Sequence, residues 1–275
     1  MTYIIAEIGI NHNGSETLAR QLIDQAKEAG ADAVKFQKRT IDLVYTQEEL
    51  NKDRESPWGT TNREQKEGLE FSIDQYKGLK EYCDERGLDF IMSCWDTQSV
   101  DDVECLDVNY HKVASALATD RKFLEKLNET GKSIILSTGM CTEEQIEAAM
   151  NILDNVEIVL ACTSTYPTKI EELNILHVRT LAHKYSPVKA GFSNHYSGHD
   201  ACVVAVALGA ECVEFHITHD RTDYGSDQAA SIEDAKSLCE AIRNVEAMVG
   251  DGVKKVYDSE VPIASKLRKI DDTTE

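Results

Sequence analysis

The chain has 275 residues and a hydrophobic fraction of 41%, which suffices for one large core or two smaller ones. Its 29 basic and 49 acidic residues give a net charge of −20, which argues against nucleic acid and anionic membranes as main partners. No apolar run is long enough to span a membrane, and the first residues lack a basic leader, so we expect a cytoplasmic protein.

Eight short runs rich in β-branched residues follow one another along the chain and are predicted to be strands. They cover residues 3–9, 33–37, 89–93, 110–114, 133–137, 156–162, 188–193 and 211–218. Amphipathic segments separate them, and several have the Ser, Thr or Asp start and the Gly end that are typical of helices. This alternation predicts an α/β fold, a (β/α)8 TIM barrel. A doubly wound open sheet is the alternative, but no G-x-G-x-x-G sequence follows the first run.

Two segments depart from the alternation. A polar insertion at about 38–71 follows the second predicted strand, and a stretch of this length is usually either functional or mobile. A C-terminal tail at about 251–275 follows the last predicted helix. Neither segment has the pattern of a second domain, so we expect residues 1–275 to form a single catalytic barrel domain.

The eight cysteines do not have the spacing of a metal or disulfide framework. No two of them are closer than ten residues in sequence, so the C-x₂₋₄-C pair of a zinc ribbon is missing. Most fall within apolar strand or helix patterns. We therefore interpret them as small buried hydrophobic residues in a reducing compartment.

Strand alternation indicates which side chains face the barrel interior. In the last two predicted strands Phe192 and Phe215 suit the helix-covered outside, which directs Ser193 and Glu214 inward. The same rule collects polar residues at the C-terminal mouth, where barrel active sites lie. They are Glu7, Lys35, Gln37, Ser93, Lys112, Ser115, Ser137, Ser193, His195 and His216. Because uncompensated burial of a charge is costly, the two lysines favour a site for an anion and a metal ion.

Four of the eight histidines lie in two short stretches, GFSNHYSGHD (191–200) and VEFHITHD (213–220). His195 and His216 end adjacent predicted strands and point inward, whereas His199 and His219 fall at a helix start and in a loop. Two imidazoles are a sparse ligand set, so water and substrate oxygens would complete the coordination. That arrangement is typical of a catalytic ion rather than a structural one.

Ordered motifs run along nearly the whole chain. They are AEIGINHNG (6–14), AGADAVKFQ (29–37), HKVAS (111–115), GKSIILSTGM (131–140), CTSTYPT (162–168), GFSNHYSG (191–198), ALGAECVEFHIT (207–218) and GSDQAAS (225–231). Taken together they resemble the sialic acid synthase family of enzymes that condense phosphoenolpyruvate (PEP). The resemblance implies a transferase that joins PEP to an N-acetylmannosamine-like or related aldose. Its products would be phosphate and a 3-deoxy-2-keto sugar acid of the nonulosonic type.

The resemblance also implies roles for individual residues. His195 and His216 match the ligands of a divalent ion, Mn²⁺, Mg²⁺ or Co²⁺, and Glu7 matches a catalytic carboxylate that acts on the water added at C2 of PEP. The positions that match PEP-binding residues are Lys35, Ser93, Lys112, Ser115, Ser137 and Ser193. Those that match sugar-binding residues are Gln37, Tyr166 and Asp227. A homo-oligomer is implied as well.

The chain departs from the family pattern at several places. The usual TPFD is SCWD (93–96), which alters a wall near the sugar; Leu117 replaces an acidic residue; and 226–228 read Ser-Asp-Gln instead of Pro-Asp-His. The family's C-terminal antifreeze-like domain, with the arginine that it contributes, does not follow the barrel, which indicates a short form. A neighbouring subunit or the insertion would then cover the mouth, and the insertion residues considered are Arg39, Lys52, Arg54 and Trp58.

Two other function classes stay open on the sequence alone. One is a metal-dependent sugar isomerase or epimerase, which would normally need more carboxylates around the ion. The other is a barrel that binds a ligand without catalysis. His12, in the HNG sequence after the first predicted strand, is either part of a turn or a substrate contact.

Overall fold

A closed barrel of eight parallel strands forms the centre of the computed structural model, which describes residues 1–222, 224 and 228–269. The barrel is closed by the pairing of β1 with β10. Its strands are β1 (Tyr3–Gly9), β2 (Ala33–Lys38), β5 (Asp89–Cys94), β6 (Tyr110–Val113), β7 (Ser133–Ser137), β8 (Val156–Cys162), β9 (Lys189–Asn194) and β10 (Cys212–His216). All eight predicted strands are confirmed, although the last ends at His216 instead of residue 218.

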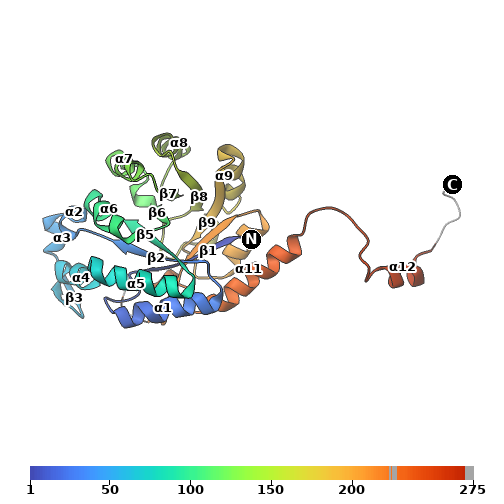
Figure 1. The fold of residues 1–275 in the computed structure, drawn as a ribbon, viewed down its shortest axis with the longest axis horizontal. Helices are drawn as coiled ribbons and strands as arrows, with labels where there is room; N and C mark the ends of the chain where they lie inside the picture. The colour runs from blue at the N-terminus through green and yellow to red at the C-terminus, as the bar shows by residue number, and fades with distance from the viewer. Residues whose placement is uncertain (223, 225–227, 270–275) are drawn as a thin grey trace.

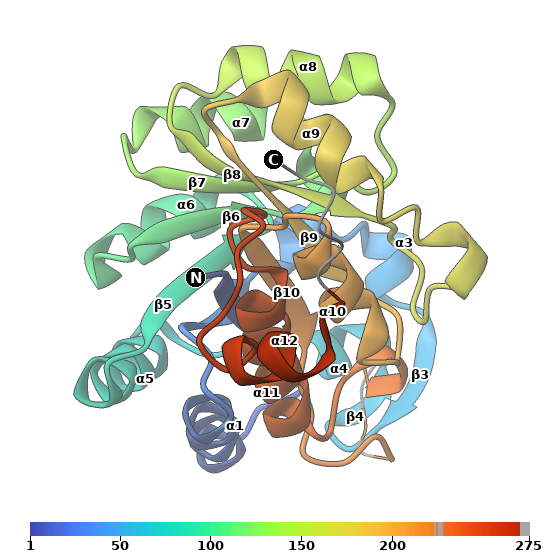
Figure 2. The ribbon, with the colours of Figure 1, turned by 90° about the vertical axis from the view of Figure 1, so that its right-hand side faces the viewer.

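Helices surround the strands on the outside, as Figures 1 and 2 show. They are α1 (Glu16–Ala29), α5 (Ile73–Arg86), α6 (Thr97–Val103), α7 (Arg121–Glu129), α8 (Glu143–Ile152), α9 (His177–Tyr185), α10 (Asp200–Ala207) and α11 (Ala235–Val249). Their starts follow the expected capping chemistry: the Ser15 side chain, for example, accepts a hydrogen bond from the Leu18 amide at the start of α1. The predicted (β/α)8 barrel is therefore confirmed.

Two separate apolar clusters stabilise this arrangement. The larger one lies between the strands and the helices, where Phe36 and Phe90 stack with ring centroids 5.2 Å apart. The smaller one consists of inward-facing residues: Ile5, Ala33, Ile91, Ile135, Ile158, Leu160 and Cys212. It fills the barrel interior on the N-terminal side of the polar residues. The open end of the barrel is therefore the C-terminal end of the strands.

The insertion between β2 and α5 contains regular elements. They are α2 (Ile41–Val44), α3 (Gln47–Leu50), the hairpin of β3 (Asp53–Ser56) and β4 (Gly59–Thr61), and α4 (Asn62–Leu69). Trp58 at the hairpin turn packs so closely on Gly68 that a Cβ there would lie 2.1 Å from the indole Cγ. The Trp58 ring also contacts Tyr224, with centroids 5.6 Å apart, and Arg54 Nε donates to the Tyr224 hydroxyl at 3.2 Å. The hairpin thus contacts the segment that follows β10.

The C-terminal segment after α11 lies away from the barrel (Figure 1). It contains α12 (Val261–Leu267), whose apolar side chains Val261, Ile263 and Leu267 are exposed. No helix in the described part of the chain is both long and apolar enough to cross a membrane.

His12 belongs to the core of the protein. Its side chain is 1% exposed, its ring stacks on Phe71 with centroids 4.1 Å apart, and its Nδ1 accepts from the Gly14 amide at 3.1 Å. The imidazole therefore fixes the turn between β1 and α1 and packs it against the end of the insertion. Burial, together with the nearby positive charge of Arg39, lowers the pKa of His12 to about 3.

This depressed pKa predicts a pH-dependent loss of stability. Below pH ~6.5 the unfolded chain takes up a proton at His12, whereas the folded chain does so only near pH 3. The free energy of unfolding should therefore fall as the pH drops through this window, by about 1 kcal/mol between pH 7.5 and 5.5 from this residue alone. Urea unfolding at both pH values should show that His12→Gln removes this share of the loss. The matched variant of an exposed histidine, His183→Gln, should retain it; equal pH slopes for the wild type and His12→Gln would contradict the assignment.

Candidate active site

A cavity of about 400 Å³ opens at the C-terminal mouth of the barrel. Most of the residues predicted for the site line it, namely Glu7, Lys35, Gln37, Ser115, Ser137, Tyr166, Ser193, His195 and His216. Ser93 and Lys112 are buried just behind this lining. Asp227 lies outside the described residues. The insertion adds lining residues that the sequence analysis did not assign, namely Tyr45, Lys66, Leu69 and Glu70.

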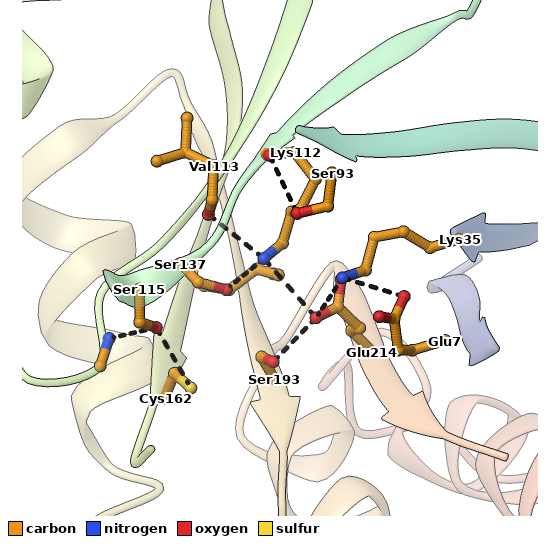
Figure 3. A network of polar contacts seen from close by, with 12 residues as sticks. Glu7, Lys35, Ser93, Lys112, Val113, Ser115, Ser137, Cys162, Ser193 and Glu214 are labelled. Carbon is orange, nitrogen blue, oxygen red and sulfur yellow. Dashed lines mark hydrogen bonds and ion pairs between the residues drawn. The ribbon is translucent and has the colours of Figure 1, made fainter. Parts of the chain in front are cut away.

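Two buried lysines and two buried carboxylates meet at the floor of the mouth (Figure 3). Lys35 Nζ lies 3.0 Å from Glu7 Oε2 and 3.7 Å from Glu214 Oε1. Lys112 Nζ lies 3.6 Å from the same Glu214 oxygen. The residues come from β1, β2, β6 and β10, so barrel closure is what brings them together. Their charges cancel, and this compensation makes the burial of both ammonium groups possible.

Serine hydroxyls add hydrogen bonds to this cluster. Ser137 Oγ accepts from Lys112 Nζ at 2.6 Å, and Ser193 Oγ donates to Glu214 Oε1 at 3.0 Å. Ser93 Oγ donates to the Lys112 carbonyl at 3.3 Å. Ser137 and Ser193 also line the cavity, so their hydroxyls connect the buried charges with the space above them.

Glu214 is the residue of this cluster that the sequence analysis left without a role. Burial by itself would raise the pKa of its carboxyl group, but Lys112 and Lys35 outweigh burial and lower the pKa to about 2. Strand alternation already directed Glu214 into the barrel, where Lys35 and Lys112 also point. The presence of an inward carboxylate among inward lysines could therefore have suggested an ion pair. The positive charge of the site is therefore smaller than the two lysines alone would give, because two carboxylates pair with them.

The two inward histidines lie side by side at the mouth, at the ends of adjacent strands. His195 follows β9 and His216 ends β10; their ring centroids are 5.3 Å apart and each side chain is 5% exposed. The Tyr166 ring contacts both imidazoles, with centroid distances of 4.1 and 5.8 Å. His199 and His219 lie where the sequence analysis placed them, at a helix start and in a loop: His199 directly precedes α10 without a capping bond, and His219 is exposed.

The chemistry of this pair fits a divalent cation with open coordination positions. His195 Nδ1 lies 2.8 Å from the Thr163 carbonyl, so a proton on Nδ1 leaves the Nε2 lone pair available as a ligand. Within residues 1–222, 224 and 228–269 no group of three or more His, Cys, Asp and Glu is placed to hold a metal. An ion held by His195 and His216 would therefore take its other ligands from water or substrate.

Cys162, at the end of β8, differs from the other cysteines. All eight are free thiols, and five are buried as predicted: Cys83, Cys94, Cys202, Cys212 and Cys239. The Cys162 Sγ lies 3.7 Å from His195 Nδ1 and 3.7 Å from Ser115 Oγ. Burial would raise the pKa of this thiol, but the adjacent His195 outweighs burial and lowers it to about 7. The thiol thus contacts two residues that line the cavity, Ser115 and His195, which its sequence context did not indicate.

The shared carboxylate of Glu214 should be essential for stability. Glu214→Gln keeps the shape and the Ser193 contact but leaves two buried ammonium groups with less negative charge, so we expect a loss of ~3 kcal/mol in the free energy of unfolding. Urea denaturation at neutral pH measures it. The control Glu157→Gln removes an exposed carboxylate from β8 and should cost less than ~1 kcal/mol. Equal losses in the two variants would show that the lysines do not depend on Glu214.

Comparison with known proteins adds independent observations. The NeuB family model matches residues 22–254. Over 274 residues the chain is 35% identical to human N-acetylneuraminate-9-phosphate synthase, a match that covers 97% of this chain and 76% of that protein. It is 34% identical over 281 residues to the N,N'-diacetyllegionaminic acid synthase of Legionella pneumophila, which covers 97% of this chain and 78% of the relative.

Solved structures agree with these matches. The N-acetylneuraminic acid synthetase of Leptospira borgpetersenii superimposes with a TM-score of 0.84 at 28% identity, covering 98% of this chain and 93% of that one. A 3-deoxy-D-arabino-heptulosonate 7-phosphate synthase from Thermotoga maritima, at 15% identity and a TM-score of 0.61, shares the fold. On the extent of the family match and the identity to its members, the chain belongs to the NeuB family.

Proposed function

We propose that the protein is a metal-dependent synthase that condenses PEP with an aldose to give a 3-deoxy-2-keto sugar acid and phosphate. The observation that carries the proposal is the placement of a lysine–carboxylate cluster beside a histidine pair in one cavity. Relatives named as synthases of neuraminate phosphate, legionaminic acid and pseudaminic acid support it. We also propose that the enzyme is cytoplasmic and works as a homo-oligomer.

The lower part of the cavity suits PEP. The phosphate and carboxylate of PEP need cationic and hydroxyl donors, which Lys35, Lys112, Ser115, Ser137 and Ser193 supply. We assign Ser93 to the same group through its bond to the Lys112 backbone. On this assignment the sugar occupies the outer part of the cavity, next to Tyr166 and the insertion.

The reaction needs one carbon–carbon bond and one water. C3 of PEP attacks the aldehyde carbon of the open-chain sugar, and the oxygen of that aldehyde takes up a proton. Water adds at C2 and loses a proton. The bond between C2 and the phosphate oxygen then breaks, and the departing phosphate takes up the proton of the C2 hydroxyl as the ketone forms. We assign the water proton to Glu7, whose carboxylate lies 3.0 Å from Lys35 Nζ.

A divalent ion, Mn²⁺, Mg²⁺ or Co²⁺, would contribute Lewis acidity toward the aldehyde oxygen when bound. His195 and His216 are the residues that would hold it, and the Thr163 carbonyl would keep the His195 ring in the orientation required for binding.

Turnover should require PEP, an aldose and a metal together. Protein incubated with Mn²⁺, PEP and a panel of N-acetylhexosamines, hexoses and their phosphates should release phosphate and 2-keto-3-deoxy acid in equal amounts with at least one aldose. A chelator should abolish both signals, and added Mn²⁺ should restore them. Conversion of an aldose without PEP would instead favour an isomerase or epimerase, and intact protein that turns over no aldose would contradict the proposal.

Mn²⁺ binding and turnover should depend on His195 and His216 but not on the nearby His199 and His219. His216→Ala removes one of two proposed protein ligands, so we expect at least a ~100-fold loss of kcat and much weaker Mn²⁺ binding. Titration of Mn²⁺ followed by electron paramagnetic resonance measures the binding without substrate. His199→Ala and His219→Ala are the matched controls, and both should bind Mn²⁺ and turn over as the wild type does. Unchanged Mn²⁺ affinity in His216→Ala would refute the ligand assignment.

A further inference from the structure

The side chain of Gln37 is occupied by contacts within the protein. Its Nε2 donates to Glu7 Oε1 at 2.6 Å, and its Oε1 accepts from Arg39 Nη2. A guanidinium can only donate, so the amide oxygen of Gln37 must face Arg39 and the amide nitrogen must face Glu7. The orientation of the amide is therefore determined by Arg39, and both ends of this side chain are engaged.

Arg39 is itself held from two sides. Its guanidinium lies over the Trp95 ring, 4.4 Å from the centroid, and its Nη1 lies 3.5 Å from Glu70 Oε1. The Arg39 backbone amide also donates to Glu70 Oε2 at 3.2 Å. The planar guanidinium can lie over an aromatic ring while separate nitrogens reach a carboxylate and an amide oxygen; a lysine ammonium offers a single nitrogen and cannot make all three contacts in this geometry.

Backbone contacts join the segments that carry these side chains. Trp95 N donates to the Lys38 carbonyl at 2.9 Å, and the Thr40 amide donates to Asp96 Oδ2 at 2.7 Å. The residues after β2 and after β5 thus form one unit at the rim of the mouth. SCWD differs from TPFD at residues 93, 94 and 95, and the third of these, Trp95, provides the ring on which Arg39 rests.

The backbone of β1 leaves room for the same contacts. Gly9 has a φ of +54°, and a Cβ built there would lie 2.9 Å from Glu7 Oε1 and 3.0 Å from Gln37 Nε2. A side chain at this position would press on both partners of the hydrogen bond. Glycine is therefore required both by the backbone conformation and by the space that the pair occupies.

We propose that Arg39 is a positioning residue that acts through Gln37 on the Glu7 carboxylate. With Gln37 on Oε1 and Lys35 on Oε2, the carboxylate is held at both oxygens. Trp95 and Glu70 fix Arg39, and Arg39 fixes the amide. The catalytic role of the positioned carboxylate rests on the proposed function. In this proposal Gln37 supports Glu7, whereas the sequence analysis assigned it to the sugar contacts.

Steady-state kinetics provide the first test. Arg39→Met keeps an apolar stem against Trp95 but removes the donor to Gln37, so we expect kcat to fall ~10- to 100-fold while the KM for PEP changes less than ~3-fold. Arg39→Lys restores one donor and should recover part of the loss. Because both residues act through one chain of contacts, the double variant Gln37→Met/Arg39→Met should be no slower than Gln37→Met alone. A kcat within 2-fold of the wild type in Arg39→Met, or additive losses in the double variant, would overturn the proposal.

The control for the insertion is Arg63→Met. Arg63, in α4, forms ion pairs with Asp42 and Glu67 at 2.7 and 3.2 Å and does not line the cavity. Its removal disturbs the insertion without touching Gln37, so kcat should stay at the wild-type value. A loss equal to that of Arg39→Met would mean that the insertion as a whole, rather than the Arg39 contact, supports activity.

A second measurement needs no substrate. In protein labelled with ¹⁵N-glutamine, the Gln37 side-chain NH₂ signals are identified by their absence from Gln37→Met. In the wild type we expect them to lie outside the range of solvent-exposed amides, because Nε2 donates to a buried carboxylate. They should move into that range in Arg39→Met and stay in place in Arg63→Met. Unmoved signals in Arg39→Met overturn the proposal, even if the wild type turns over no aldose and the proposed function fails.

Discussion

Glu214 shares one carboxylate between two lysines on different strands, with Nζ–Oε1 distances of 3.7 Å for Lys35 and 3.6 Å for Lys112. Lys35 also pairs with Glu7, at 3.0 Å, whereas the ion pair of Lys112 is the one with Glu214. The desolvation of an unpaired charge costs several kcal/mol, so the burial of Lys112 in particular depends on this carboxylate. The carboxylate therefore connects β2, β6 and β10 at one level of the barrel. The serines on β7 and β9, the histidines above them and the cavity itself are arranged around this neutral cluster.

Along the barrel axis the interior changes from apolar packing to polar site residues within two residues of each strand. On several strands an inward apolar residue is followed two positions later by an inward polar one. The pairs are Ile5 and Glu7, Ala33 and Lys35, Ile91 and Ser93, Ile135 and Ser137, and Cys212 and Glu214. The apolar members form a common layer that excludes water from below, so the polar members interact in surroundings where hydrogen bonds and ion pairs are strong. One rigid scaffold therefore provides both stability and the geometry of the site.

Features that produce a short repeating pattern of apolar and polar residues could be predicted from the sequence. The barrel, its eight strands and the inward placement of His195 and His216 all rest on alternation, which is local. The contacts of Gln37, Arg39 and Glu70 could not be predicted, because they depend on how a non-periodic insertion folds back on the rim. The ion pairs that neutralise the lysines could not be predicted for a related reason. Strand alternation gives the direction of the Glu214 side chain but not its distance from Lys35 and Lys112. The sequence left His12 open between a turn and a substrate contact, because the three-residue HNG sequence does not reveal that Phe71 packs on the imidazole.

The hairpin of the insertion makes three parts of the chain interdependent. Trp58 lies on Gly68 and against Tyr224, and a Cβ on Gly14 would lie 2.1 Å from the Gly68 carbonyl oxygen. The turn after β1, the insertion after β2 and the segment after β10 therefore share one close contact region. A grafted insertion without Trp58 or Gly68 would leave Tyr224 and the turn at Gly14 without these contacts. Recombination between members of such a family would accordingly succeed only when all three segments are exchanged together.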